Sequence, residues 1–249
     1  MSNQASHFDL AIVIPCYNEE NRLPLSSFEN FIQQNKECLI YFVNDGSSDN
    51  TIKVLQKFKN TFSENVDFLD LEENLGKAGA VREGFLTAQQ KFQFDKIAYL
   101  DADLSTSLEE CKTLSKEIKD ETVFVFGSRI SKTDNNIDRK FYRFLIGRFI
   151  ATLISNQLKL KVYDTQCGCK IFDGKISESL FQEEFISKWL FDVEIFHRLI
   201  AKFGLEKIKT IAKEVPLDAW VDTEDSRVKF TYFFKLWFDL FSIGRKYKK

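Results

Sequence analysis

The sequence lacks the features that mark several classes of protein. It has no apolar run of about 18 residues, so it predicts no transmembrane helix. Its start, Met1–Phe8, is polar and lacks the basic-then-apolar pattern of a secretory signal. Neither G-x-x-x-x-G-K-[ST] nor G-x-G-x-x-G occurs, which disfavours P-loop and Rossmann dinucleotide enzymes. We therefore expect a cytosolic protein that does not use these phosphate-binding motifs.

The chain also has a small net charge, few histidines and an odd number of cysteines. The net charge of -2 predicts no nucleic-acid partner, so attraction to a membrane would need a local patch. The two histidines are His7 and His197, and we expect His197 on a helix surface. The five cysteines are odd in number and lie in apparent core segments, which indicates reduced, buried thiols. The segment Cys167–Cys169 lacks a nearby histidine and is weak evidence for a metal site.

The order of apolar and amphipathic segments predicts an α/β fold. Apolar runs typical of buried strands alternate with helix-length segments, as in a mostly parallel, doubly wound sheet. The expected strands are Leu10–Pro15, Leu39–Val43, Val66–Leu69, Lys96–Leu100, Thr122–Phe126 and Ile208–Pro216. The expected helices are about Leu25–Lys36, Asp49–Asn60, Lys77–Phe92, Leu108–Lys119, Asp138–Leu160 and Trp189–Phe203.

Polar side chains follow four of the expected strands. Ligands of such sheets bind beyond the carboxyl ends of the strands, so these side chains predict one shared site. They are Tyr17–Glu19, Asp45 with Asp49, Asp101 with Asp103, and Arg129.

Asp101 and Asp103 stand two residues apart at the end of an apolar strand, so both can face one ligand. Paired carboxylates repel unless a cation lies beside them, and hard oxygen ligands suit Mg²⁺ or Mn²⁺. The alternative is a helix cap, in which Asp103 or Ser105 caps the helix that starts near Ser107.

The second half of the chain is rich in aromatic and basic residues. The helix expected over Asp138–Leu160 is basic at its start, and the tail Arg227–Lys249 combines aromatic with basic side chains. One interpretation is that both segments pack in the core. The other, which we favour, is that they lie at a membrane surface and bind anionic lipid. We expect one domain over residues 1–226 and an amphipathic helical tail over residues 227–249.

Three motifs together resemble glycosyltransferase family 2, whose members have the GT-A fold and transfer sugars from nucleotide-diphosphate donors with inversion. These are Ile14–Glu19, Val43–Asp49 and Asp101–Asp103.

Four further segments resemble the polyprenol-phosphate branch of that family, and most closely the dolichyl-phosphate β-glucosyltransferases, with dolichyl-phosphate mannose synthases as cousins. In the third segment Cys169 stands where the family usually has Phe. The segments are Asn74–Arg82, Gly127–Arg129, Asp164–Lys170 and Trp189–Glu194.

The resemblance implies a place for the nucleoside of the donor. Asp45 would hold it, and Pro15, Tyr17 and Glu19 would form the other wall of the site. The alternative for Asp45 is a tight turn, and the alternative for Asp49 is a helix cap.

The resemblance also implies a place for the metal and the sugar. Asp103 would bind Mg²⁺ or Mn²⁺, while Asp101, with Ala102, would hold the sugar or the waters of the metal. Lys77 would reach a donor phosphate, or else be a solvated lysine at a helix start.

Arg129 and Arg143 would bind the phosphate of the acceptor, since arginine binds phosphate with fork geometry. For Arg143 the alternative is an ordinary surface position. An anionic phosphate is already a nucleophile, so no strong general base is needed. Asp192 and Glu194 have a structural salt bridge as their alternative role. The candidates for positioning the acceptor or the sugar are Gln166, Lys170, Asp192 and Glu194.

Together these features predict a metal-dependent inverting glycosyltransferase that moves a hexose, with glucose from UDP-glucose favoured, to a dolichyl- or undecaprenyl-type phosphate. It would act as a peripheral protein on the cytosolic face of a membrane. The alternatives are a family 2 enzyme with a glycan or protein acceptor, or a non-catalytic nucleotide-sugar-binding protein. The sequence leaves open the sugar, the base, the polyprenol length, and whether the chain forms a homo-oligomer.

Overall fold

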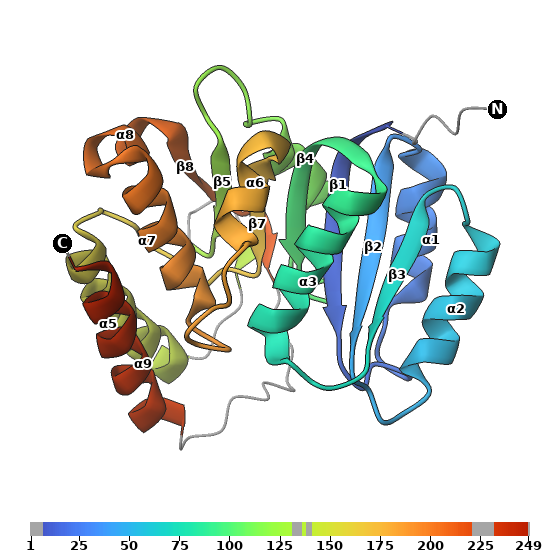
Figure 1. The fold of residues 1–249 in the computed structure, drawn as a ribbon, viewed down its shortest axis with the longest axis horizontal. Coiled ribbons are helices and arrows are strands. Elements are labelled where there is room, and N and C mark those ends of the chain that lie inside the picture. The colour runs from blue at the N-terminus through green and yellow to red at the C-terminus, as the bar shows by residue number, and fades with distance from the viewer. Residues whose placement is uncertain (1–6, 131–135, 138–140, 221–231, 249) are drawn as a thin grey trace.

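The structure, a computed structural model, describes residues 7–130, 136–137, 141–220 and 232–248, with side chains outside 136–149 and 232–235. Its centre is a seven-stranded sheet in the order β3-β2-β1-β4-β7-β5-β8 (Figure 1). Neighbouring strands are parallel except β7, which is antiparallel to both β4 and β5. The strands are β1 (His7–Cys16), β2 (Cys38–Asp45), β3 (Val66–Leu71), β4 (Gln93–Leu100), β5 (Phe124–Ser128), β7 (Cys169–Asp173) and β8 (Ala212–Pro216); β6 (Asn136–Ile137) and β9 (Ala219–Trp220) form a separate pair.

Helices cover both faces of the sheet because the central strands are apolar on both sides. In β2, Tyr41 belongs to one buried cluster and its neighbour Phe42 to the other. On the Phe42 face lie α1 (Leu25–Gln34), α2 (Thr51–Thr61) and α4 (Leu108–Ser115). On the Tyr41 face lie α3 (Gly76–Lys91), α6 (Gly174–Phe181) and α7 (Phe191–Phe203), and beyond them α5 (Phe141–Leu158), α8 (Leu205–Ile211) and α9 (Tyr232–Tyr247).

The prediction of a mostly parallel, doubly wound sheet with a C-terminal helix is confirmed. The strand expected over Ile208–Pro216 is wrong in its first half, where α8 ends at Ile211 and only then β8 begins. Ile208 and Ile211 are both buried, and their spacing of three residues is that of a helix face. The helix α6 was not expected.

His197 is buried rather than on the surface, because α5 and α9 cover α7. Its side chain is 7% exposed, lies 3.2 Å from the Gln157 amide nitrogen, and stacks on Tyr247 of α9. Burial lowers the pKa of His197, and Glu194 opposes that shift.

The helix α9 packs against the domain with one face and exposes the other. Leu236, Leu240 and Ile243 are buried in the same cluster as α7, as the core-packing interpretation expected. The boundary expected at residues 226 and 227 lies outside the described residues. Among the helices that the structure describes, none is both long enough and apolar enough to cross a bilayer.

The five cysteines are free and buried, as the sequence predicted. Burial is the main cause that raises the pKa of Cys38 and of Cys167 to about 12.

Candidate active site

The carboxyl ends of β1, β2, β4 and β5 meet at one edge of the sheet. Because β7 is antiparallel, it starts where the others finish: Cys169 is paired with Leu100, the last residue of β4. The turn before β7 therefore lies beside Asp101, although more than sixty residues of chain separate the two motifs.

Hydrogen bonds join the loops after β1 and β2 into one unit. The Asn18 amide donates to Ser47 Oγ (3.0 Å), and Asn18 Oδ1 accepts from the Ser48 amide (2.9 Å). The Glu19 amide donates to Thr51 Oγ1 (2.8 Å). The first two motifs thus form a single wall of the site.

Within this wall the predicted residues have different surroundings. Tyr17 is 38% exposed, whereas Pro15 is half-buried. Asp49 accepts the amides of Thr51 (3.0 Å) and Glu20 (3.1 Å), but the N-cap residue of α2 is Asn50, so the cap alternative for Asp49 is wrong by one position.

Asp45 fixes the start of α3. Its carboxylate is almost completely buried and accepts the Leu75 amide at 2.7 Å. Burial raises the pKa of Asp45, while the amides of Leu75 and Gly76 oppose the shift. The turn is tight: Gly46 has a φ of +58°, and a Cβ there would lie 2.5 Å from the Asn74 nitrogen. The turn alternative is confirmed, and a contact of Asp45 with a nucleoside stays a prediction.

Lys77, in the first turn of α3, is paired with a carboxylate instead of being solvated. Its Nζ lies 2.5 Å from Asp101 Oδ1 and 5.9 Å from the centre of the Tyr99 ring. Burial opposes the charge of the ammonium, but Asp101 and then Asp192 outweigh it and raise the pKa of Lys77. The pair joins the start of α3 to the end of β4.

Asp101 is also bounded by the turn before β7. A Cβ added to Gly168 would lie 2.0 Å from Asp101 Oδ2, far inside any real contact. Only glycine lets this turn approach the carboxylate so closely.

Asp103 is not a helix cap. Ser107 caps α4, since its Oγ accepts the Glu110 amide at 3.0 Å. Asp103 Oδ1 accepts the amide and the hydroxyl of Ser105, both at 2.9 Å. The cap alternative is therefore wrong, and the half-buried Asp103 stands with Asp101 at the end of β4.

Arg129 forms a forked ion pair with Asp164. Its Nε lies 2.6 Å from Asp164 Oδ2 and its Nη2 lies 2.9 Å from Oδ1. Burial alone would lower the pKa of Arg129 and raise that of Asp164. The opposite charge of the partner outweighs burial in both cases, so the pKa of Arg129 is raised and that of Asp164 is lowered. Glu214 Oε1 accepts the Asp164 amide at 2.8 Å, and the guanidinium lies over Trp220. The Arg143 side chain lies outside the described residues.

The remaining positioning candidates are mostly buried. Lys170 is 0% exposed, and its Nζ lies 2.7 Å from Asp192 Oδ1. Glu194 is also 0% exposed and accepts the Ile186 amide (2.8 Å) as well as a hydrogen bond from α9. These contacts favour the structural salt-bridge role for Asp192 and Glu194. Gln166 is half-buried beside Asp164.

Comparison with known proteins identifies the family. Residues 11–181 match the family model described as "Glycosyl transferase family 2", which covers more than half of the chain. The chain belongs to glycosyltransferase family 2. The resemblance stated from its motifs is confirmed, and the protein is a glycosyltransferase.

Curated relatives of this glycosyltransferase are dolichyl-phosphate beta-glucosyltransferases. One from Trichomonas vaginalis is 30% identical, over 96% of this chain and 74% of the relative. Those from Drosophila melanogaster and Homo sapiens are each 29% identical, over 96% of this chain and 75% of the relative.

Solved structures support the GT-A fold of the glycosyltransferase. Glucosyl-3-phosphoglycerate synthase from Mycobacterium tuberculosis, solved with Mn²⁺, UDP-glucose and phosphoglyceric acid, aligns with a TM-score of 0.67 at 13% identity, over 96% of this chain and 80% of that one. Mannosyl-3-phosphoglycerate synthase from Rubrobacter xylanophilus aligns with a TM-score of 0.66 at 14% identity, over 96% of this chain and 73% of that one. At these identities the likeness concerns the fold alone.

Three residues of the glycosyltransferase that sequence reasoning did not single out help to build the site. Asp164 holds Arg129, Gly168 admits Asp101, and the Lys188 side chain packs where a Cβ on Gly76 would lie. Asp164 and Gly168 belong to a motif on which the family resemblance rests, so the sequence did contain a signal for their role. The sequence contains no such signal for Lys188, because its place in the site depends on how a loop folds over α3.

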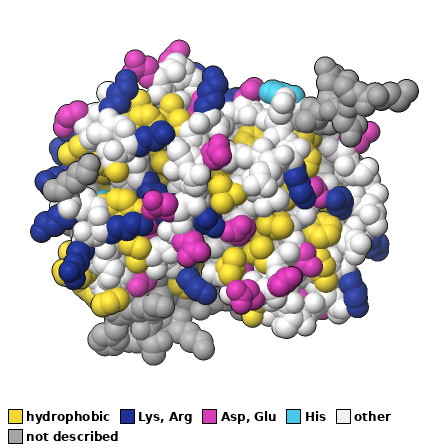
Figure 2. Space-filling model, viewed as in Figure 1, with side chains coloured by type: hydrophobic (Ala, Val, Ile, Leu, Met, Phe, Trp, Pro, Cys, Tyr) yellow, Lys and Arg dark blue, Asp and Glu magenta, His cyan; other side chains and the backbone are white. Residues whose placement is uncertain are grey.

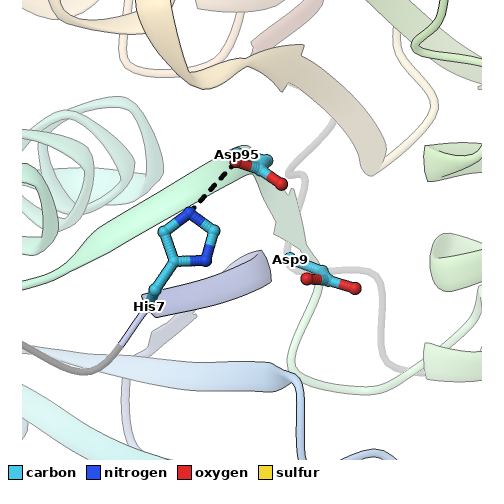
Figure 3. Close-up of side chains that lie close together, drawn as sticks. All are labelled: His7, Asp9 and Asp95. Atoms are coloured by element: carbon cyan, nitrogen blue, oxygen red, sulfur yellow. Dashed lines mark hydrogen bonds and ion pairs between the residues drawn. The ribbon is translucent and has the colours of Figure 1, made fainter.

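A separate group of metal-binding side chains lies at the other end of the sheet. His7, Asp9 and Asp95 place one ligand atom each within 4.8 Å of the others, and His7 Nε2 lies 3.1 Å from Asp95 (Figure 3). All three are exposed and stand at the amino ends of β1 and β4, about 30 Å of strand away from the active-site edge. They are not part of the candidate active site.

Proposed function

We propose that this glycosyltransferase transfers glucose from UDP-glucose to dolichyl phosphate or a related polyprenyl phosphate, with inversion at the sugar. The observation that supports it best is the continuous series of contacts along the active-site edge. Asp45 holds the start of α3, and Lys77 joins that start to Asp101. The substrate class comes from the names of the curated relatives.

On the donor side, the joined loops after β1 and β2 would receive the nucleoside. Tyr17 offers an exposed aromatic ring and Asp45 a carboxylate for the base or ribose. Lys77, in the first turn of α3, would attract the diphosphate, because a helix start favours anions.

The residues present fit a divalent cation. Asp101 and Asp103 offer the hard oxygen ligands that Mg²⁺ and Mn²⁺ prefer, and the missing side chain of Gly168 makes room for the Asp101 carboxylate itself. When bound, the ion would offset the negative charge of the departing nucleoside diphosphate. Asp103 is proposed as the main ligand and Asp101, with Ala102, as its neighbour on the sugar side.

On the acceptor side, Arg129 would bind the lipid phosphate. Asp164 occupies its Nε–Nη2 edge and holds the guanidinium in place, which, among the described residues, leaves Nη1 to donate to a phosphate oxygen. The sequence places Arg143 as its partner. A phosphate oxygen needs no base to become a nucleophile, which agrees with the lack of histidine in the motifs of the site.

The test is transfer from radiolabelled UDP-glucose to dolichyl phosphate in detergent, with and without EDTA. We expect a glucolipid that extracts into organic solvent and whose formation falls to background in EDTA and returns with Mn²⁺. A labelled product that stays in the aqueous phase with added glycan or protein would instead identify another acceptor. Binding of UDP-glucose without any product would contradict an enzymatic role for the site.

We also propose that the outer face of α9 binds an anionic membrane surface, where a polyprenyl phosphate resides. Trp237, Phe238 and Phe241 are 49%, 70% and 69% exposed, Arg245 follows on the same helical face, and Lys248 comes directly after the helix. Figure 2 shows hydrophobic and basic side chains interleaved at the end of the molecule where α5 and α9 lie. Aromatic side chains inserted among headgroups and cations beside them are typical of interfacial helices.

Replacing Phe238 and Phe241 by serine is expected to weaken binding to vesicles of phosphatidylcholine with 30% phosphatidylserine by about tenfold, since each ring loses apolar burial. Flotation of the protein with the vesicles measures it. The matched control replaces Lys207 and Lys209, exposed on α8, by glutamine and leaves flotation unchanged. Equal flotation of all three proteins would contradict the assignment of this face.

A further inference from the structure

Three buried polar side chains from three elements contact one another beside the active site. Lys170 of β7 stands opposite Tyr99 of β4 in the sheet, and its Nζ lies 5.4 Å from the centre of the Tyr99 ring. The Nζ lies 2.7 Å from Asp192 Oδ1 in the first turn of α7, and the Tyr99 hydroxyl donates to the same oxygen. Lys170 and Tyr99 are both 0% exposed. A buried ammonium is unfavourable unless it is paired, so these groups satisfy one another as a unit.

This unit holds the turn before β7, which lies against one carboxylate oxygen of Asp101. Lys170 Nζ donates to the Cys167 carbonyl at 2.7 Å. The next residue is Gly168, whose Cα faces Asp101 Oδ2 with no room for a Cβ. A shift of the Cys167 carbonyl would therefore move the backbone against which that oxygen rests.

The same unit borders the group that binds the other oxygen of Asp101. Lys77 Nζ lies 2.5 Å from Asp101 Oδ1 and 5.9 Å from the centre of the Tyr99 ring. The Tyr99 ring is thus shared by two ammonium groups, and the hydrogen bond from its hydroxyl to Asp192 fixes the ring between them. Both oxygens of Asp101 contact groups whose positions depend on this buried unit.

We propose that Lys170, Asp192 and Tyr99 are positioning residues that hold the Asp101 carboxylate in the orientation in which it binds a divalent cation. They do so from behind the site and without touching substrate. The proposal rests on the proposed function, since it presumes that Asp101 helps to bind the cation. Loss of a group that orients a metal ligand typically weakens metal binding by about 10- to 100-fold.

The test compares Tyr99→Phe with Tyr41→Phe. Tyr41 is a second 0% exposed tyrosine of the same sheet, and among the described residues its hydroxyl has no hydrogen-bond partner. Each variant loses one buried hydroxyl and keeps its ring, so both should fold. Mn²⁺ binding in the presence of UDP is measured by the electron paramagnetic resonance signal of free Mn²⁺, and UDP binding in EDTA by calorimetry.

We expect the dissociation constant for Mn²⁺ to rise about tenfold in Tyr99→Phe and to stay unchanged in Tyr41→Phe, with UDP binding in EDTA equal in both. Lys170→Met should show the same pattern with a larger rise. Equal Mn²⁺ constants in the two tyrosine variants would overturn the positioning role alone. So would a parallel loss of Mn²⁺ and metal-free UDP binding, which indicates general loosening. Failure of the unchanged protein to bind Mn²⁺ and UDP would overturn the proposed function together with it.

Discussion

Replacing Asp103 by asparagine is expected to lower turnover by about 100- to 1000-fold while the fold is retained. Asparagine keeps an oxygen to accept the two hydrogen bonds from Ser105, but it removes the charge that a divalent cation needs. The loss should appear in kcat at saturating UDP-glucose and Mn²⁺, with a thermal midpoint close to that of the unchanged protein.

Asp70→Asn is the matched control for this change. Asp70 is likewise a carboxylate near the end of a parallel strand; it is exposed and accepts a hydrogen bond from Asn44 at 2.7 Å. It takes no part in the contacts around Lys77 and Asp101, so we expect near-normal turnover. If Asp103→Asn kept more than about a tenth of the activity, Asp103 would not be the main metal ligand.

Gly168→Ala is expected to reduce kcat/KM by about 100-fold, because the new methyl group would overlap Asp101 Oδ2. The carboxylate would have to turn away, and the ion pair with Lys77 would break. Overpacking of this kind usually also costs about 1–3 kcal/mol in the free energy of unfolding. Steady-state kinetics and thermal denaturation of the same preparation measure the two effects.

Gly204→Ala serves as the opposite control. Gly204 joins α7 to α8 with a φ of +85°, and apart from its chain neighbours no atom of the part of the chain that the structure describes lies within 4 Å of a Cβ placed there. Alanine at this position should lower stability by about 1–3 kcal/mol through backbone strain and leave kcat/KM unchanged. Activity in Gly168→Ala that falls no further than in Gly204→Ala would show that the glycine does not act through Asp101.

The fold could be predicted from the sequence because its main signal is local. Strands such as Leu10–Pro15 and Leu39–Val43 are continuous apolar runs, which both faces of a buried parallel sheet require. The predictions of secondary structure and burial were wrong at positions where contacts with distant parts of the chain determine the structure. Ile208 and Ile211 are spaced for a helix, yet the apolar and β-branched residues around them also suit a strand. His197 is buried only because α5 and α9, which are distant from α7 in the sequence, cover it.

The candidate site was predictable as an edge but not as a set of contacts. The polar residues after each strand, such as Asp45 and Asp101, indicated where ligands would bind. The pairing of Lys77 with Asp101 depends on how α3 is placed over β4, and that of Arg129 with Asp164 on the reversed direction of β7. The spacing of these residues in the sequence does not predict that either pair is in contact.

The reversed strand also has a consequence for synthesis on the ribosome. The strands β1 to β4 follow one another in the chain, with helices between them, and are neighbours in the sheet. The strand β5 has β7 and β8 as its sheet neighbours, so it cannot join the sheet before residue 173 has been made. At about 5–20 residues per second, β4 therefore presents an unpaired apolar edge for several seconds. We expect nascent chains halted between β5 and β7 to bind chaperones and to associate with one another, whereas chains extended past β7 have that edge covered.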